Sequence, residues 1–255
     1  VIDFHDIEWQ YLEGDGDFRS REVTALRDEA DIIVTNPPFS LFREFWAWLM
    51  DVDKQFIIIA NKNCVTYKEV FPYIMQNKVW SGCKPWAGGM WFETKNPDDV
   101  DKIIDGIDMK NVPSIFITNI DHGRRHQPLS LMTMEENIMY SKHKEIRGKG
   151  YEHYENYDGI EVPYTDAIPS DFEGMMGVPI SFLDKYCPEQ YSILGMCENE
   201  NLYSLKTRVY TTKECKDAYM IKFGKPGTYD LNASGVVLRN GLREKVYQRI
   251  LIKKI

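Results

Sequence analysis

The chain has 255 residues and a mass of 29.8 kDa, and it is 43% hydrophobic and 27% charged. This is ordinary globular composition, which excludes disordered, collagen-like and low-complexity classes. No apolar run approaches the roughly 20 residues that a membrane span needs, and residues 1–6 lack the features of a signal peptide. The five cysteines are scattered and form no CxxC pair. We therefore expect a soluble, cytoplasmic protein with reduced thiols, no membrane partner and no metal site.

The charge is unevenly distributed along the sequence. A net charge of −8 and a pI near 5.3, taken alone, argue against a nucleic-acid binder. However, residues 1–120 hold 12 Lys and Arg against 20 Asp and Glu, whereas residues 121–255 hold 19 of each kind. The second half can therefore carry a basic face.

The first half alternates between strand-like and helix-like segments. Residues 31–35 are a β-branched strand that must end at two prolines, and Ser40 then has the character of a helix N-cap. The apolar face of that helix is Leu41, Phe42, Phe45, Trp46, Leu49 and Met50. The further elements expected, in chain order, are a strand at 55–60, a helix at 66–78, and strands beginning at 79 and spanning 113–118. This alternation predicts an α/β fold with a parallel sheet and crossover helices.

The remaining segments show a weaker pattern. Residues 82–108 are expected to be a loop with a short helix, and the sequence beyond residue 121 predicts an irregular α+β region. Short strands are expected there at 191–194, 218–223 and 246–252. We therefore expect two domains, residues 1–120 and residues 121–255.

The tetrapeptide Asn36-Pro37-Pro38-Phe39 is the segment that points to chemistry. An Asn at the carboxyl end of a parallel strand lies where open α/β sheets bind ligands. The prolines fix the backbone, so that the Asn36 side-chain oxygen and the Pro37 carbonyl can converge on an amino group that has two hydrogens. Such acceptors stabilise the positive charge that grows as an amine nitrogen attacks an electrophile. With Phe39 to stack on a planar base, the arrangement fits methyl transfer to a nucleobase amine.

A strand-ending turn with Phe39 in the core is the alternative interpretation of the same tetrapeptide. The context favours the functional interpretation, because the tetrapeptide directly follows a strand and directly precedes a helix.

Residues 31–42 resemble the catalytic segment of EcoRI-type adenine-specific DNA methyltransferases, the modification methylases. Other segments resemble that family in the same order, namely 14–20, 61–63, 66–69, 118–126, 168–169, 177–180 and 246–252. The resemblance implies part of a Rossmann-like methyltransferase sheet that uses S-adenosylmethionine to methylate N6 of an adenine flipped out of double-stranded DNA. A cognate restriction endonuclease is a further partner that it implies.

The resemblance also implies roles for individual residues. Asn36 and Pro37 would hold the amine, Pro38 would fix the backbone, and Phe39 would stack on the base. Asp15 or Asp17 would touch the adenosine half of the cofactor together with the Asn36 region, or form a solvated acidic turn. The aromatic residues at 86–92 that could pack on the other face of the base are Trp86, Trp91 and Phe92.

One feature departs from the family pattern. The 35 residues before Asn36 contain no Gly-rich cofactor loop, and the segment 14–16 is too close to Asn36 and of the wrong kind. We therefore expect an N-terminally truncated piece of a longer enzyme, whose cofactor pocket is incomplete.

The basic residues divide into two groups. Those expected to grip DNA phosphates are Arg124, Arg125, Lys142 and Lys144, with Arg147 and Lys149 nearby. A solvated surface patch is the alternative, which is favoured for any single lysine, whereas DNA contact is favoured for the pair Arg124 and Arg125. The C-terminal group lies on strand-like sequence and is expected to be a solvated surface; it consists of Arg239, Arg243, Lys245, Arg249, Lys253 and Lys254.

Three functions remain open from the sequence. The leading hypothesis is a site-specific DNA adenine-N6 methyltransferase. The second is an RNA or protein-glutamine methyltransferase, because the Asn-Pro-Pro-aromatic pattern also serves other amines. The third is a non-catalytic DNA-binding remnant.

Overall fold

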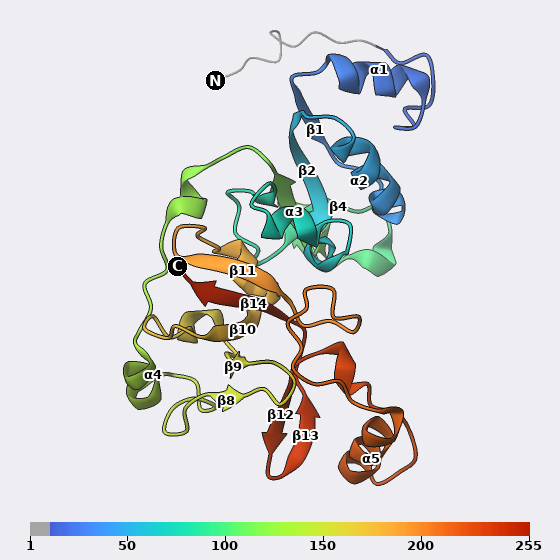
Figure 1. The fold of residues 1–255 in the computed structure, drawn as a ribbon. Helices are drawn as coiled ribbons and strands as arrows, with labels where there is room; N and C mark the ends of the chain where they lie inside the picture. Colours follow the sequence, from blue (N-terminus) through green and yellow to red (C-terminus); the bar gives the residue numbers. More distant parts are fainter. Residues whose placement is uncertain (1–10) are drawn as a thin grey trace. The chain divides into compact units, whose positions relative to one another are not determined.

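A computed structural model describes residues 11–255 (Figure 1). The chain divides into two units: unit 1 comprises the residues up to Pro72 together with Val79–Asp121, and unit 2 comprises Tyr73–Lys78 and His122–Ile255. Among residues 11–255, no helix has the length and apolar character needed to cross a bilayer.

Unit 1 is built on a four-stranded sheet in the order β1-β2-β7-β3. The strands are β1 (Ile32–Thr35), β2 (Gln55–Asn61), β3 (Trp80–Ser81) and β7 (Ser114–Thr118). β1 and β2 are parallel, as the sequence predicts, with Ile33 opposite Phe56. β7 lies antiparallel to both β2 and β3, so the prediction of an all-parallel sheet is wrong. The strand β7 inserts between β2 and β3 because its pairing is set by long-range packing, which local spacing does not encode.

Two helices of unit 1 lie next to β1 in the sequence, and the second of them packs against the sheet. α1 (Arg21–Glu29) precedes β1, and α2 (Phe42–Met50) connects β1 to β2. Trp46 of α2 packs edge-on against Phe56 of β2, with ring centroids 5.9 Å apart, and both rings are buried. The opposite face of β1 is open, since Ile32 is 48% and Val34 is 73% exposed.

Two helix boundaries differ from the sequence-based predictions. Ser40 lies inside a 3-10 turn, Phe39–Leu41, and does not cap α2. The predicted helix at 66–78 shortens to α3 (Phe71–Met75). Pro72, which has no N–H, fits only the first turn of a helix, and Asn77 at φ 55° stops the helix at its other end.

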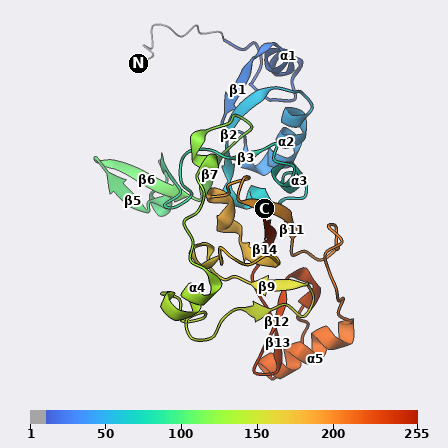
Figure 2. The same cartoon turned by 60° about the vertical axis from the view of Figure 1, so that its left-hand side comes forward.

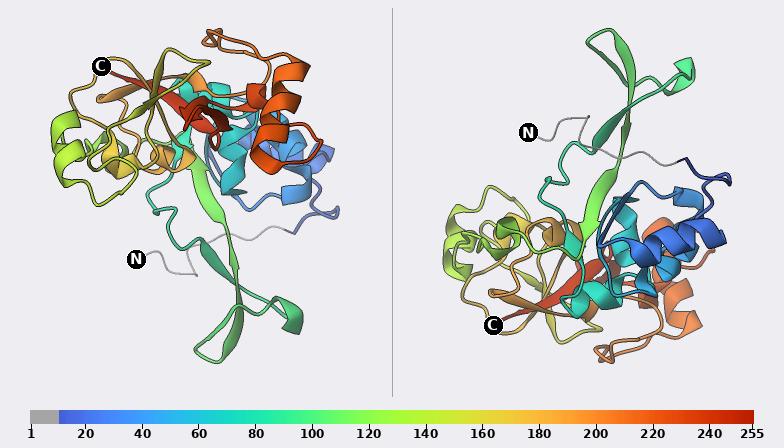
Figure 3. Two further views of the ribbon diagram at one scale, coloured as in Figure 1. Left: turned by 90° about the horizontal axis from the view of Figure 1, so that it is seen from below. Right: turned by 90° about the horizontal axis from the view of Figure 1, so that it is seen from above.

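The segment 82–108, predicted to be a loop with a short helix, contains the 3-10 turn Pro97–Asp99 but otherwise contributes to a three-stranded antiparallel sheet. This sheet consists of β4 (Met90–Glu93), β5 (Lys102–Ile104) and β6 (Ile107–Val112) in the order β4-β6-β5. The β5–β6 hairpin extends away from the four-stranded sheet (Figures 2 and 3). Its turn is Asp105-Gly106, and both residues have positive φ. The dipeptide Asp-Gly is a sequence signal for a tight hairpin, which hydrophobic periodicity alone does not reveal.

Unit 2 contains a five-stranded mixed sheet in the order β11-β14-β10-β9-β8. The strands are β8 (Glu152–His153), β9 (Gly159–Glu161), β10 (Met175–Pro179), β11 (Tyr191–Met196) and β14 (Arg249–Lys254). β14 lies between β11 and β10 and is antiparallel to both. The strands expected at 191–194 and 246–252 are therefore confirmed, with shifted ends.

The rest of unit 2 comprises α4 (Met134–Tyr140), α5 (Thr212–Phe223) and a hairpin of β12 (Val236–Arg239) and β13 (Leu242–Lys245). The strand predicted at 218–223 is wrong, because those residues end α5. Thr211 and Glu214 form a capping box at the start of α5. This is the local signal that outweighs the β-favouring residues near the end of the helix.

Candidate active site

The tetrapeptide Asn36–Phe39 follows the carboxyl end of β1, where an open α/β sheet presents ligand-binding groups. Asn36 is exposed, and its side chain makes no hydrogen bond within the described part of the chain. Pro37 is buried, whereas Phe39 is 40% exposed and therefore is not a core residue. The Asn36 amide oxygen and the Phe39 ring are thus both available to a ligand.

A cavity of about 510 Å³ lies beside the tetrapeptide. Asn36, Pro37 and Pro38 line it together with Asp15 and Asp17, which precede β1 in the sequence. The structure therefore brings the two aspartates predicted to bind the cofactor into the same cavity as Asn36.

Hydrogen bonds hold the acidic loop at residues 13–19 in place. The Glu22 carboxylate of α1 accepts bonds from the backbone N–H groups of Glu13 and Gly14, at 2.7 and 3.0 Å. The Asp17 carboxylate accepts bonds from the Arg19 guanidinium, the shortest 2.6 Å, and from the Arg19 backbone N–H at 2.8 Å. These bonds lower the pKa of Asp17 to about 2. Asp17 is therefore a fixed anion, whereas Asp15 accepts only the Asp17 backbone N–H among the described residues.

The apolar wall of this cavity comes from aromatic residues that the sequence analysis did not assign to it. Phe18 packs edge-on against Phe45 and Trp48, with ring centroids 5.4 and 5.7 Å apart. The Arg27 guanidinium lies 4.8 Å from the Trp48 ring centroid. Phe18 directly follows Asp17 in the sequence. An aromatic residue next to an acidic turn is the local pattern that could have predicted an apolar surface beside the two aspartates.

The aromatic residues predicted to pack on the other face of a flipped base lie elsewhere in unit 1. Trp91 and Phe92 belong to β4, and Trp86 lies in the segment before it. None of the three lines the cavity beside Asn36 or the smaller cavity beside Phe39.

The residues predicted to grip DNA differ in their surroundings. Arg124 pairs with Asp184 at 2.9 Å, and Arg125 is only 9% exposed, with its guanidinium bonded to Asn77. Lys142 is exposed but pairs with Asp166 at 2.7 Å.

Lys144 is exposed and forms no ion pair with the described residues, and Arg147 and Lys149 share this property. These three cations lie on one loop after α4, which is anchored by the buried side chain of Ile146. We call residues 144–149 the basic loop. Its three cations are not paired with a carboxylate of the described residues.

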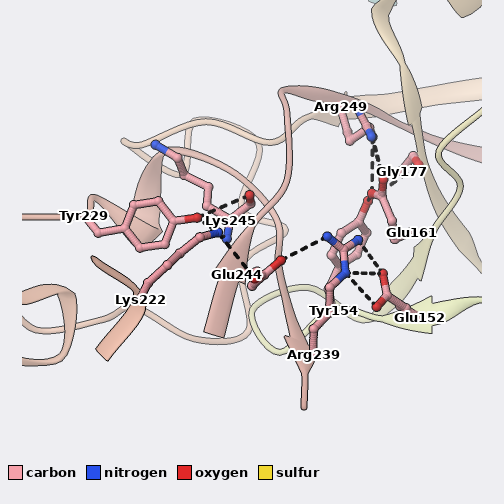
Figure 4. A network of polar contacts seen from close by, with 10 residues as sticks. All are labelled: Glu152, Tyr154, Glu161, Gly177, Lys222, Tyr229, Arg239, Glu244, Lys245 and Arg249. Atoms are coloured by element: carbon pink, nitrogen blue, oxygen red, sulfur yellow. Dashed lines mark hydrogen bonds and ion pairs between the residues drawn. The ribbon is translucent and has the colours of Figure 1, made fainter. Parts of the chain in front are cut away.

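The C-terminal arginines, in contrast, are engaged by carboxylates (Figure 4). Arg249 donates to Glu161 at 2.6 and 2.9 Å, and both side chains are almost fully buried. Tyr154 also donates to Glu161, and burial raises the pKa of the Tyr154 hydroxyl well above its ordinary value. Arg239 bonds to Glu152 and Glu244 at 2.7 and 3.1 Å. The expectation of a solvated surface is therefore wrong for Arg249, and both arginines stabilise the fold of unit 2 with little charge left for DNA.

Comparisons with known proteins show which family the chain belongs to. The family described as "Adenine-specific methyltransferase EcoRI" matches residues 1–255. The chain belongs to this family. No solved structure matches the chain.

Among the relatives, the Type II methyltransferase M.EcoRI of Escherichia coli is 40% identical over 202 residues, which are 75% of this chain and 58% of that protein. The Type II methyltransferase M.MpnI of Mycoplasma pneumoniae is 31% identical over 220 residues, which are 83% of this chain and 66% of that protein. M.MgeORF184P of Mycoplasma genitalium is 31% identical over 252 residues, which are 95% of this chain and 70% of that protein. The chain therefore spans between about half and two thirds of the length of these relatives.

Proposed function

We propose that this chain carries the catalytic segment of a restriction-modification DNA methyltransferase that methylates N6 of adenine. Its family membership supports a DNA adenine methyltransferase. The observation that carries the proposal is Asn36, because its exposed amide makes no hydrogen bond within residues 11–255 and lies at the end of β1 beside a large cavity.

The proposed chemistry uses groups of this chain. The Asn36 side-chain oxygen and the Pro37 carbonyl accept hydrogen bonds from the target amine, which leaves the nitrogen lone pair free to attack. As the nitrogen becomes positive, these two acceptors stabilise the charge. Phe39 stacks on the extruded base, which compensates for part of the stacking lost on leaving the duplex.

S-adenosylmethionine is the proposed methyl donor. The cavity beside Asn36 fits such a group, because it joins carboxylates that can accept hydrogen bonds from an adenosine to the apolar surface of Phe18 and Trp48. When bound, the cofactor supplies an electrophilic methyl group. Asp15 is the better candidate for direct contact, because Arg19 already engages the carboxylate of Asp17.

The four-stranded sheet of unit 1 is, in this proposal, part of a Rossmann-like methyltransferase sheet. The parallel pair β1–β2 with α2 between them, and a site at the carboxyl end of β1, support this assignment. The division into a catalytic domain, residues 1–120, and a DNA-recognition region, residues 121–255, also remains a proposal, as does a cognate endonuclease.

Double-stranded DNA is the proposed substrate, and Lys144, Arg147 and Lys149 on the basic loop are the proposed phosphate contacts. Their exposure and lack of ion pairs within the described residues support this role. Arg124, Arg125 and Lys142 are weaker candidates, because each already bonds to a protein group.

The test has two parts. Calorimetric titration of S-adenosylmethionine into the chain measures cofactor binding directly. Transfer of a labelled methyl group is then compared on duplex DNA, RNA and a peptide containing glutamine, followed by nucleoside analysis of the product. Label in N6-methyladenine from duplex DNA supports the proposal, whereas label only in RNA or peptide contradicts it.

A further inference from the structure

A second cavity, of about 290 Å³, opens on the Phe39 side of the tetrapeptide. It is lined by residues 39–44 and by Tyr67, which follows the 3-10 turn Lys62–Thr66 after β2. Asn36 and Pro37 line the larger cavity, Phe39 lines the smaller one, and Leu41 lines both. The tetrapeptide and the turn after it therefore separate two binding spaces, of which the larger is the proposed cofactor cavity.

Arg43 gives the smaller cavity its positive charge. Its guanidinium lies 4.8 Å from the centroid of the Tyr67 ring, a cation–π contact that orients the group. Its Nε lies 3.5 Å from Glu69 Oε2, and the side chain is 64% exposed. Its two terminal nitrogens form no hydrogen bond with the described residues. A guanidinium fork oriented in this way matches the geometry of a phosphate.

The helix position of Arg43 and the other groups that line the cavity bear on what this cavity can bind. Arg43 lies in the first turn of α2, where the helix dipole is positive, so the protein gains no helix stability from a cation there. Glu44 also lines the cavity, and its carboxylate lies 3.3 Å from the Arg19 guanidinium, which pairs with Asp17 as well. The remaining polar side-chain groups of the lining residues are the hydroxyls of Ser40 and Tyr67. A cation, a hydroxyl and the exposed Phe39 ring together suit a phosphorylated sugar next to a planar base.

We infer that the smaller cavity receives the sugar–phosphate of the nucleotide whose base stacks on Phe39, with Arg43 bound to the phosphate. This inference rests on the proposed function, because it requires an extruded nucleotide. A nucleotide that leaves the stack carries its own backbone with it, so the contact to Arg43 forms only when the base is flipped. Arg43 therefore favours the flipped state over the stacked one.

The test compares two DNA probes at several salt concentrations. One duplex has an adenine opposite an abasic site, which lowers the energy needed for extrusion, and the other is fully paired. We expect Arg43→Gln to weaken binding of the abasic probe by about 10-fold, the loss of one charge-assisted hydrogen-bonded contact. Binding of the paired duplex should change by less than about 2-fold, and the salt slope for the abasic probe should fall by about one.

Matched variants separate this contact from a general loss of charge. Arg21→Gln removes an exposed cation of the same unit, outside both cavities, and should weaken neither probe selectively. Tyr67→Leu removes the ring that orients Arg43 and should weaken the abasic probe selectively, whereas Tyr67→Phe should not.

Equal weakening of both probes by Arg43→Gln, or no weakening of either, would overturn the inference. If the wild-type chain still methylates adenine in DNA under those results, the proposed function stands without the phosphate contact. If the wild-type chain neither binds the probes nor methylates DNA, the proposed function fails together with the inference.

Discussion

Polar side chains around the tetrapeptide of unit 1 and around the five-stranded sheet of unit 2 are used in opposite ways. Around the tetrapeptide of unit 1, the amide of Asn36 and the terminal nitrogens of Arg43 make no hydrogen bond with residues 11–255. In unit 2, Arg239 and Arg249 each bond to carboxylates, and Arg249 does so almost fully buried. An unpaired polar group costs little free energy as long as it is exposed to water, whereas a buried charge requires a partner. The first kind of group is free for a ligand, and the second kind stabilises the fold.

The largest expected effect is on catalysis, at Asn36. Asn36→Ala should lower the rate of methyl transfer to DNA by at least about 10²-fold, because it removes an acceptor that stabilises charge in the transition state. The free energy of unfolding should change by no more than about 0.5 kcal/mol, since the side chain has no partner to lose. The two quantities are measured by labelled methyl transfer and by urea denaturation.

Asn96→Ala is the matched control, because Asn96 lies on the segment between β4 and β5 and lines neither cavity. It should leave the rate unchanged. A fully active Asn36→Ala variant would show that the tetrapeptide is a structural turn and would remove the basis for the comparison between the units.

The second prediction concerns stability, at the buried pair Arg249–Glu161. Arg249→Met leaves the Glu161 carboxylate buried without its cation and should lower the free energy of unfolding by about 3–5 kcal/mol. Urea denaturation of the variant measures this loss. Adding Glu161→Gln removes the stranded charge, so the double variant should recover much of the stability. A double variant no more stable than the single one would show that packing of the Arg249 side chain, and not the ion pair, supplies the stability.

The third prediction contrasts free and paired cations in unit 2. Replacing Lys144, Arg147 and Lys149 by Gln should reduce the salt slope of DNA binding by about three, because each residue releases about one counterion. Arg239→Gln should leave the slope nearly unchanged, since Glu152 and Glu244 already offset its charge. Fluorescence anisotropy with labelled duplex DNA measures both slopes. If Arg239→Gln reduced the salt slope as much as each replacement in the basic loop, the assignment of the basic loop as the phosphate contact would be contradicted.

The smallest expected effect is a local one, at the start of α5. Hydrogen bonds from the Thr211 backbone and then from Arg208 lower the pKa of Glu214 to about 2. Because the folded-state pKa lies below the ordinary value of 4.5, the stability this carboxylate contributes is complete above pH 4.5 and is lost as the pH falls toward 2. The chemical shift of the Thr211 amide should follow this titration, with a midpoint near the lower value.

Thr211→Ala is the complementary variant for this capping box. It removes the hydroxyl that accepts the Glu214 backbone N–H and should destabilise the protein by about 1 kcal/mol. A Thr211 amide that titrates near pH 4.5 in the wild-type chain would contradict the bonded carboxylate.

Local patterns of the sequence predicted much of unit 1. A β-branched strand, two prolines and an apolar helical face specify β1, the tetrapeptide and α2, because each depends on residues close in sequence. The Asp105-Gly106 and Asn240-Gly241 turns and the Thr211–Glu214 capping box were equally local signals. These signals favour hairpins at 102–112 and 236–245 and a helix over Thr212–Phe223.

Only the tertiary structure decided which distant residues meet. Arg249 and Glu161 are 88 residues apart, and their contact depends on the order of strands in the five-stranded sheet. Tertiary packing likewise places β7 between β2 and β3. It also brings Asp15 into the same cavity as Asn36 and the Tyr67 ring against the Arg43 guanidinium. The sequence by itself predicted Asn36 as the candidate acceptor, because that prediction depends on neighbouring residues, whereas the tertiary structure decided which cations are paired with carboxylates.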